Sequence, residues 1–120
     1  MRKRILIVDD DRDILFTFKS CLEGVGWEVT CYDESLTALY KFKPGYYDRL
    51  LIDIRMPNLN GFELVDRLRI MEKDLKVCFV TAFEGYYWTL REIYPTLDAK
   101  CFVNKPISCA DLMNHLMKYH

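Results

Sequence analysis

"RILIVDDDRD", residues 4–13, places four carboxylates within five positions directly after an apolar run. The run from Ile5 to Val8 has no polar position, which is typical of a strand buried on both faces of a parallel sheet. Because adjacent carboxylates repel one another, solvent, hydrogen-bond donors or a cation must offset their charge where the strand ends. The stretch alone therefore leaves four interpretations open: a solvated turn, a helix cap, a metal site or part of a catalytic centre.

Beyond this stretch, short β-rich runs alternate with stretches of helical periodicity as far as the C-terminus. The predicted strands are Arg4–Val8, Trp27–Tyr32, Arg49–Asp53, Lys76–Thr81 and Lys100–Asn104. The predicted helices cover residues 12–23, 35–43, 61–71, 85–94 and 108–118. This alternation implies right-handed crossovers and a parallel sheet covered by helices on both faces, an α/β fold.

Length and composition indicate one domain, residues 1–120, with 51% hydrophobic residues to form its core. Seventeen basic and eighteen acidic side chains give a net charge of −1, and no basic tail or stripe predicts contact with nucleic acid. No apolar run approaches the roughly 20 residues that span a bilayer, and the N-terminus lacks the apolar core of a signal peptide. We therefore expect no membrane partner and a cytoplasmic location.

The cysteines are five in number, widely spaced and without a C-x-x-C pair: Cys21, Cys31, Cys78, Cys101 and Cys109. An odd, scattered set in a cytosolic protein indicates free thiols that are mostly buried. We expect neither disulfides nor a zinc site.

Polar residues stand where the predicted strands end, which is where parallel α/β sheets bind ligands. The first strand is followed by Asp9 and Asp10, the third ends at Asp53, the fourth ends at Thr81 and the fifth leads into Lys105. If these strands are neighbours, three carboxylates and one ammonium group meet in one cleft. A hard divalent cation with oxygen ligands, most plausibly Mg²⁺, would balance the remaining charge.

Such a cation, with open coordination positions, suits phosphate chemistry. Lys105 would neutralise one phosphoryl oxygen, and the hydroxyl of Thr81 would donate to another. Asp53 stands alone opposite the pair Asp9 and Asp10, so it is the candidate nucleophile that would form an acyl phosphate.

Asp11 and Asp13 have a different predicted role from the two residues before them. Asp11 occupies the N-cap position of the first helix, and Asp13 lies in its first turn, where negative charge is favourable. The D-x-D-x-D spacing from Asp9 also matches the start of a calcium loop, but Ile14 occupies the position that requires glycine.

The segments "LIVDDD", "LLIDIRMPNLNGFEL", "CFVTAF" and "FVNKPI" together resemble the response-regulator receiver domain of two-component signalling. Their order and spacing match that family over almost the whole chain, and the combination is far more specific than any single segment. The resemblance implies a flavodoxin-like sheet of five strands in the order 2-1-3-4-5 with five helices. It also implies a signalling phosphoacceptor that catalyses only its own phosphorylation and dephosphorylation.

The same resemblance assigns roles in phosphoryl transfer. Asp53 matches the phosphoacceptor, charged by a phosphohistidine on a histidine kinase or phosphotransfer protein. Asp10 matches a direct metal ligand, Asp9 a ligand acting through water, and the backbone carbonyl of Arg55 the third protein ligand. The ion would be Mg²⁺, with Mn²⁺ as an alternative.

Further matches concern the switch that follows phosphorylation. Thr81 matches the switch hydroxyl, and Lys105 matches the lysine that pairs with the phosphoryl group, with a usually cis bond to Pro106. Phe102 falls at the switch aromatic, often Tyr, whose hydroxyl it lacks. Phe83 falls where the family varies phosphoryl lifetime, so we expect its bulk to hinder attacking water.

The output surface in the family is formed by the fourth helix, fifth strand and fifth helix, and a homodimer on activation is compatible with it. Trp88, in the predicted fourth helix, is either a partner anchor or a packing residue. The sequence names neither the kinase nor the output, and the domain is either alone or cut from a longer protein.

Two other classes of function remain open from the sequence. A small aspartyl-phosphate hydrolase would use Asp9 as nucleophile and Asp11 two residues later, but Arg12 and Asp13 do not continue that pattern. A pseudo-receiver that acts only as a protein-binding module would not need the acidic and basic groups present here.

Overall fold

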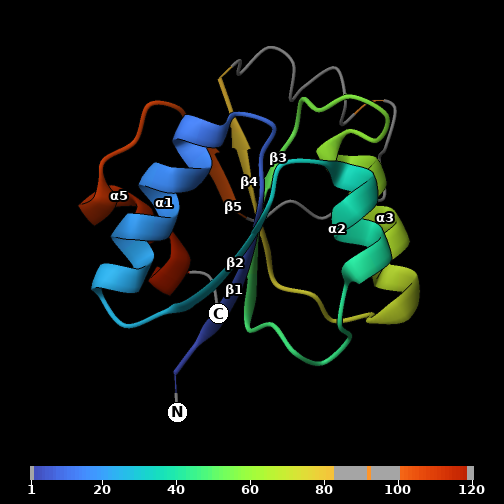
Figure 1. The fold of residues 1–120 in the computed structure, drawn as a ribbon, viewed down its shortest axis with the longest axis horizontal. Coiled ribbons are helices and arrows are strands. Elements are labelled where there is room, and N and C mark those ends of the chain that lie inside the picture. Colours follow the sequence, from blue (N-terminus) through green and yellow to red (C-terminus); the bar gives the residue numbers. More distant parts are fainter. Residues whose placement is uncertain (1, 83–91, 93–100, 119–120) are drawn as a thin grey trace.

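The computed structural model describes residues 2–82, 92 and 101–118, and it places five parallel strands in one sheet (Figure 1). The strands are β1 (Arg4–Val8), β2 (Glu28–Tyr32), β3 (Arg49–Asp53), β4 (Val77–Thr81) and β5 (Cys101–Asn104). Their order is β2-β1-β3-β4-β5, which confirms the predicted topology. The polar strand ends named above therefore meet at one edge of the sheet.

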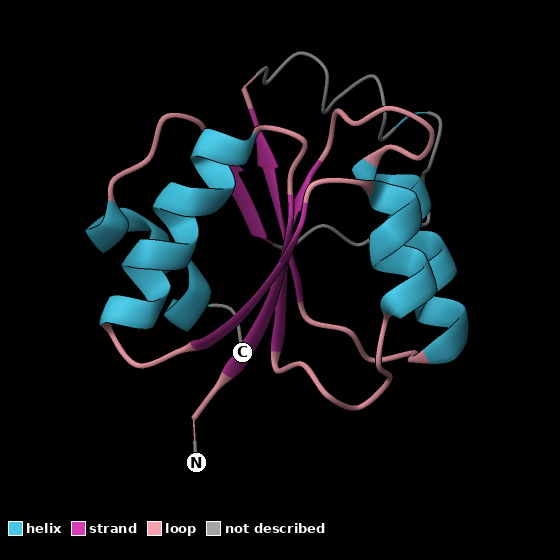
Figure 2. Cartoon of the chain, in the orientation of Figure 1, coloured by secondary structure: helices cyan, strands magenta, loops and turns pink. Residues whose placement is uncertain are grey.

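Helices cover both faces of this sheet (Figure 2). The described helices are α1 (Arg12–Gly24), α2 (Ser35–Lys41), α3 (Gly61–Met71) and α5 (Cys109–Lys118). Helices α1 and α5 pack on one face, and α2 and α3 pack on the other (Figure 1). The predicted helix at 85–94 lies outside the described residues except for position 92.

The starts of α1 and α3 follow from local capping. The Asp11 carboxylate accepts hydrogen bonds from the backbone N–H groups of Asp13 at 3.0 Å and Ile14 at 3.3 Å. This confirms Asp11 as the predicted N-cap. In α3, Asn60 and Glu63 form a reciprocal capping box. Helix α3 therefore begins at a fixed residue, eight positions after the end of β3.

Alternating side chains of the strands divide the interior into two cores. On the α2/α3 face, the rings of Phe62, Phe79 and Phe102 contact one another, with centroids 4.6 Å apart for Phe62–Phe79 and 5.7 Å apart for Phe79–Phe102. On the α1/α5 face, the stripe of α1 contributes Leu15, Phe18 and Leu22, the predicted positions, while Ile14 is only half-buried.

The prediction of free cysteines was wrong for four of the five. Cys21 is bonded to Cys109, which joins α1 to α5, and Cys78 is bonded to Cys101, which joins β4 to β5. Cys31 alone is a free thiol. Spacing along the chain gave no sign of these pairs, because they arise from sheet register and from the packing of two helices. Burial also differs from the expectation, since Cys109 is exposed.

No described helix has the length and apolar character needed to cross a membrane.

Candidate functional site

The predicted acidic residues come together at the carboxyl edge of the sheet because β1 and β3 are neighbours. Asp9 follows β1 and Asp53 ends β3, and the two strands pair in parallel register. Asp9, Asp10 and Asp53 each offer a carboxylate oxygen, and these oxygens lie within 4.8 Å of one another. Asp9 is 1% exposed and Asp53 is 5% exposed, whereas Asp10 is exposed. Two buried carboxylates therefore face one that solvent reaches.

Lys105 provides the positive charge at this edge. Its Nζ lies 2.7 Å from Asp9 Oδ2 and 3.6 Å from Asp53 Oδ1. The backbone N–H of Lys105 donates to the carbonyl of Thr81 at 2.9 Å, which ties the end of β5 to the end of β4. The Lys105–Pro106 peptide bond is cis, as the resemblance implied. The lysine therefore bridges the two buried carboxylates, and it lies closer to Asp9.

The environment of Asp53 disfavours its charged form. Burial is the main cause that raises the pKa of Asp53 from 3.8 to about 7, and the charge of Asp9 adds to it. Lys105 lowers the pKa in opposition, and Asp10 raises it further. One ammonium group thus does not compensate for three carboxylates in this space.

The residues present fit a divalent metal ion. Asp9 Oδ1 accepts a hydrogen bond from the Asp11 N–H at 2.9 Å, but the buried Oδ2 makes its ion pair with Lys105 and no hydrogen bond within the described part of the chain. Asp10, Asp53 and Arg55 line an open pocket beside this oxygen. A cluster of oxygen donors with excess negative charge is the ligand set that Mg²⁺ prefers.

The other predicted site residues fall into three groups. Thr81 is buried at the end of β4, and Ala82 lines the same pocket as Asp53. Phe102 is half-buried and belongs to the ring cluster on the α2/α3 face, away from the pocket lining. Phe83 and Trp88 lie outside the described residues.

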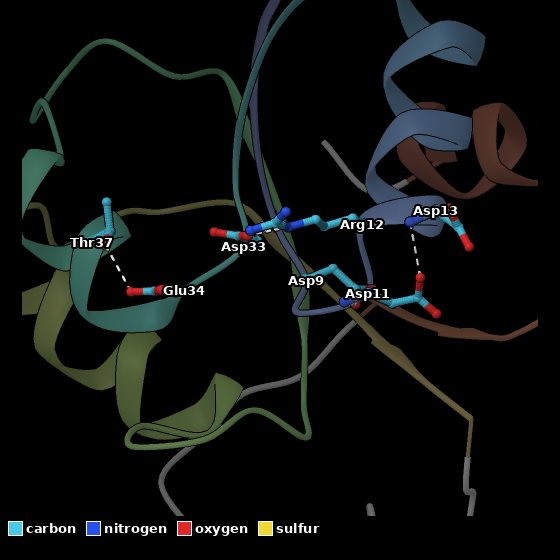
Figure 3. A network of polar contacts seen from close by, with 7 residues as sticks. All are labelled: Asp9, Asp11, Arg12, Asp13, Asp33, Glu34 and Thr37. Atoms are coloured by element: carbon cyan, nitrogen blue, oxygen red, sulfur yellow. Dashed lines mark hydrogen bonds and ion pairs between the residues drawn. The ribbon is translucent and has the colours of Figure 1, made fainter.

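Figure 3 shows Asp11 with its polar neighbours near the start of α1, and Asp11 also lines the pocket. The guanidinium of Arg12 pairs with the Asp33 carboxylate at 2.8 Å, which connects the start of α1 to the segment after β2. Asp11 is turned toward the N–H of Asp13 (Figure 3). The four carboxylates of the opening stretch therefore divide into the site pair Asp9 and Asp10 and the helix-starting pair Asp11 and Asp13.

Sequence reasoning missed Ser35, a buried residue that holds the loop beside the pocket. Its hydroxyl donates to the carbonyl of Pro57 at 3.2 Å and accepts from the N–H of Leu59 at 3.3 Å. The only sequence signal was its place at the start of a predicted helix, which does not indicate a contact 22 residues away.

Gly61, the first residue of α3, is required to be glycine by what lies beside it. A Cβ at this position would overlap the backbone carbonyl oxygen of Asp53. Its φ angle is not in the left-handed region, so close approach, and not backbone conformation, requires glycine here. The start of α3 therefore lies directly against the backbone of the candidate nucleophile.

The sheet order and the acidic edge define a doubly wound α/β domain whose site lies beyond the strand ends. Comparison with known proteins gives the same class. The family model of the response regulator receiver domain matches residues 5–117. The chain is 34% identical over 116 residues to the response regulator receiver protein CpdR of Brucella abortus, with 97% of this chain and 95% of that protein covered.

Other relatives contain the domain as a smaller part. A probable histidine kinase 3 of Oryza sativa is 40% identical over 75 residues, which cover 62% of this chain and 7% of the kinase. Among solved structures, the non-phosphorylated HemR receiver domain from Leptospira biflexa has a TM-score of 0.85 and 31% identity, with 98% of this chain and 94% of that chain covered. The chain belongs to the response regulator receiver domain family of two-component systems.

Proposed function

We propose that Asp53 accepts a phosphoryl group from a phosphohistidine on a histidine kinase or phosphotransfer protein. The observation that carries this proposal is the position of Asp53, buried at the end of β3 below an open pocket and beside Asp9, Asp10 and Lys105. A receiver domain is a signalling protein, and the chemistry it catalyses is limited to its own phosphorylation and dephosphorylation.

The transfer step is a displacement at phosphorus. A carboxylate oxygen of Asp53 attacks, the new O–P bond forms an acyl phosphate, and the P–N bond to the donor imidazole breaks. The imidazole nitrogen keeps the electron pair and takes up a proton. Lys105 Nζ, 3.6 Å from Asp53 Oδ1, is placed to pair with a phosphoryl oxygen. The hydroxyl of Thr81, on the next strand, is the second donor.

Asp9, Asp10, Asp53 and the backbone carbonyl of Arg55 would hold the metal ion, Mg²⁺ or Mn²⁺. When bound, the ion supplies positive charge that offsets the carboxylates and the incoming phosphoryl oxygens. The excess negative charge among the described residues supports this assignment. Lys105 remains in contact with Asp9 and so keeps one carboxylate neutralised from within the protein.

The response to phosphorylation would pass from Thr81 to Phe102. Thr81 moves toward the phosphoryl group, and the ring of Phe102 rotates inward as a population shift biased by the new contacts. The proposal also includes slower dephosphorylation through the bulk of Phe83, and for Trp88 either a partner anchor or a packing role. A cytoplasmic location and a single domain over residues 1–120 belong to the same proposal.

The test is phosphorylation by a small phosphodonor, comparing wild type with Asp53→Asn. Wild type should gain one acid-stable, base-labile phosphoryl group in the presence of Mg²⁺, detected by intact mass, and none after chelation. Asp53→Asn should gain none, because the amide nitrogen does not replace the nucleophilic oxygen. Asp66→Asn on the exposed side of α3 is the matched control and should behave as wild type.

Persistence of the label in Asp53→Asn would overturn the assignment. A label that instead disappears in Asp9→Asn, together with turnover of a phosphomonoester, would favour the hydrolase class described above. Wild-type protein that is never labelled, and that binds Mg²⁺ no more tightly than Asp10→Asn does, would favour a protein-binding module.

A further inference from the structure

The two cysteine pairs of this chain differ in what can reach them. Cys78 is 4% exposed and Cys101 is 2% exposed, in the core under α1 and α5. Cys109 is exposed at the start of α5, and its partner Cys21 is half-buried on α1. A reagent dissolved in water therefore meets one pair and not the other.

The exposed pair is also well placed to open and close without moving the backbone far. The Cα atoms of Cys21 and Cys109 are 5.7 Å apart, within the usual range for bonded cysteines. The two helices pack against each other independently of the bond, through the apolar core that includes Leu22 and Leu112. The thiols would thus remain neighbours after reduction.

We propose that Cys21 and Cys109 are a reversible thiol–disulfide site that reacts with small-molecule disulfides. In the oxidising direction, the thiolate of Cys109 attacks one sulfur of the reagent, which forms a mixed disulfide and releases one thiolate. Cys21 then attacks the Cys109 sulfur, which closes the protein disulfide and releases the second. Two protein thiols lose two electrons and two protons, and one reagent disulfide is reduced to two thiols.

The order of attack follows from exposure. Cys109 is the residue that solvent reaches, so it meets the reagent first, and the less exposed Cys21 completes the exchange. Cys31 provides an internal comparison, because burial raises the pKa of its thiol to about 11 and keeps it protonated. It has no bonded partner and is not expected to take part.

Closure of this site fixes the start of α5 against α1 across 88 residues of sequence. The first turn of α5 is also held by the buried side chain of Leu112 and by local bonds, such as that from the Leu112 N–H to the Ser108 carbonyl at 2.9 Å. Lys105 lies four residues before Cys109. The redox state would therefore set how firmly the segment after the candidate site is anchored.

The first experiment compares the two pairs in the folded protein. A mild monothiol should open Cys21–Cys109 at least about ten-fold faster than Cys78–Cys101, measured by differential alkylation and peptide mapping. Addition of glutathione disulfide should then close it again with release of two thiols per chain. Equal opening rates for the two pairs, or no reclosure of Cys21 with Cys109, would overturn the proposal.

The second experiment tests the order of attack. In reduced Cys21→Ser, a mixed disulfide should accumulate on Cys109, whereas in Cys109→Ser the modification of Cys21 should be at least about ten-fold slower. Cys31→Ser is the matched control and should exchange as wild type does. Equal reactivity of Cys21 and Cys109 contradicts the assignment. Should a serine variant fail to fold, acid quenching of wild type during reclosure, followed by peptide mapping, decides the order: the transient mixed disulfide should be found on Cys109, and an equal amount on Cys21 contradicts the assignment.

A third measurement reads the structural consequence without any substitution. Amide hydrogen exchange at the first turn of α5 should be several-fold faster in protein whose Cys21–Cys109 bond is open than in protein whose bond is closed. Exchange at α3, which packs on the other face of the sheet, serves as the reference. Identical rates at α5 in the two states would show that the bond does not anchor the helix.

Discussion

The two faces of the β4–β5 pair are built from the same short sequence but hold together by different means. Both strands contain Cys-Phe-Val, and the register aligns Cys78 with Cys101 and Phe79 with Phe102. Because side chains alternate, the phenylalanines face α2 and α3 and the cysteines face α1 and α5. One face is therefore joined by ring packing and the other by a covalent bond.

This difference shows what each face allows. Ring packing on the α2/α3 face is noncovalent, so a change of the Phe102 rotamer, as its proposed switch role requires, breaks no covalent bond. A covalent bond on the α1/α5 face holds the same two strands at a fixed separation. Strands β4 and β5 are thus linked covalently on the α1/α5 face, whereas their side chains on the α2/α3 face can rearrange.

The largest effect should come from truncating the aromatic face. Phe79→Ala removes a fully buried ring that contacts both Phe62 and Phe102, so we expect a loss of about 3–5 kcal/mol in the free energy of unfolding. Urea denaturation measures it. The loss should be the same with and without reductant; a loss that depends on reductant would mean that the two faces are not independent.

The free energy of unfolding should depend on pH through Asp53, which lies at the carboxyl edge of the sheet and not in either core. The pKa of Asp53 is raised from 3.8 to about 7, so its contribution is fully present below the lower value and is lost as pH rises through the upper one. Without metal, wild type should lose about 4 kcal/mol relative to Asp53→Asn between those limits. Denaturation midpoints across this range measure the difference.

Mg²⁺ should restore much of that loss in wild type and little in Asp53→Asn, because it offsets the charge that the buried carboxylate acquires. The same pH profile is expected in a variant that lacks Cys78 and Cys101. A profile that vanished with the cysteines would place its origin in the core and not at the edge.

Removing the covalent bond of the other face should cost slightly less than removing the ring. Cys78→Ala with Cys101→Ala opens a link between residues 23 apart in sequence, which by loop entropy is about 3 kcal/mol. Thermal unfolding of the double variant, compared with wild type, measures the cost. A neutral result would show that register and packing alone hold β4 to β5.

The smallest effect should come from Phe102→Tyr, which restores the aromatic usual at this position. Phe102 is half-buried and stacks on Phe79, so an added hydroxyl should change the free energy of unfolding by less than about 1 kcal/mol. The denaturation midpoint measures it. A loss comparable to that of Phe79→Ala would mean that the edge of the Phe102 ring is tightly packed and has no room for a hydroxyl. Such packing would contradict a role as a movable switch.

Local signals in the sequence predicted the parallel α/β sheet and the members of the acidic edge, and the resemblance to the receiver family supplied the strand order. Strand Arg49–Asp53 is apolar from Leu50 to Ile52 and ends at an aspartate, and the alternation of elements restricts the topology to few choices. The cysteine pairs and the Ser35 contact could not be predicted, since each joins residues far apart in sequence. Local sequence patterns do not indicate contacts between residues that lie far apart in the sequence.

The loop between β3 and α3 is closed at its base by one hydrogen bond, from the Gly61 N–H to the Ile54 carbonyl at 2.8 Å. Residues 55–60 thus form a loop whose two ends are fixed beside Asp53, and Ser35 makes hydrogen bonds to the middle of this loop. The side chains of this loop can therefore vary, and with them the surface that the loop presents, while its backbone stays fixed beside the candidate nucleophile.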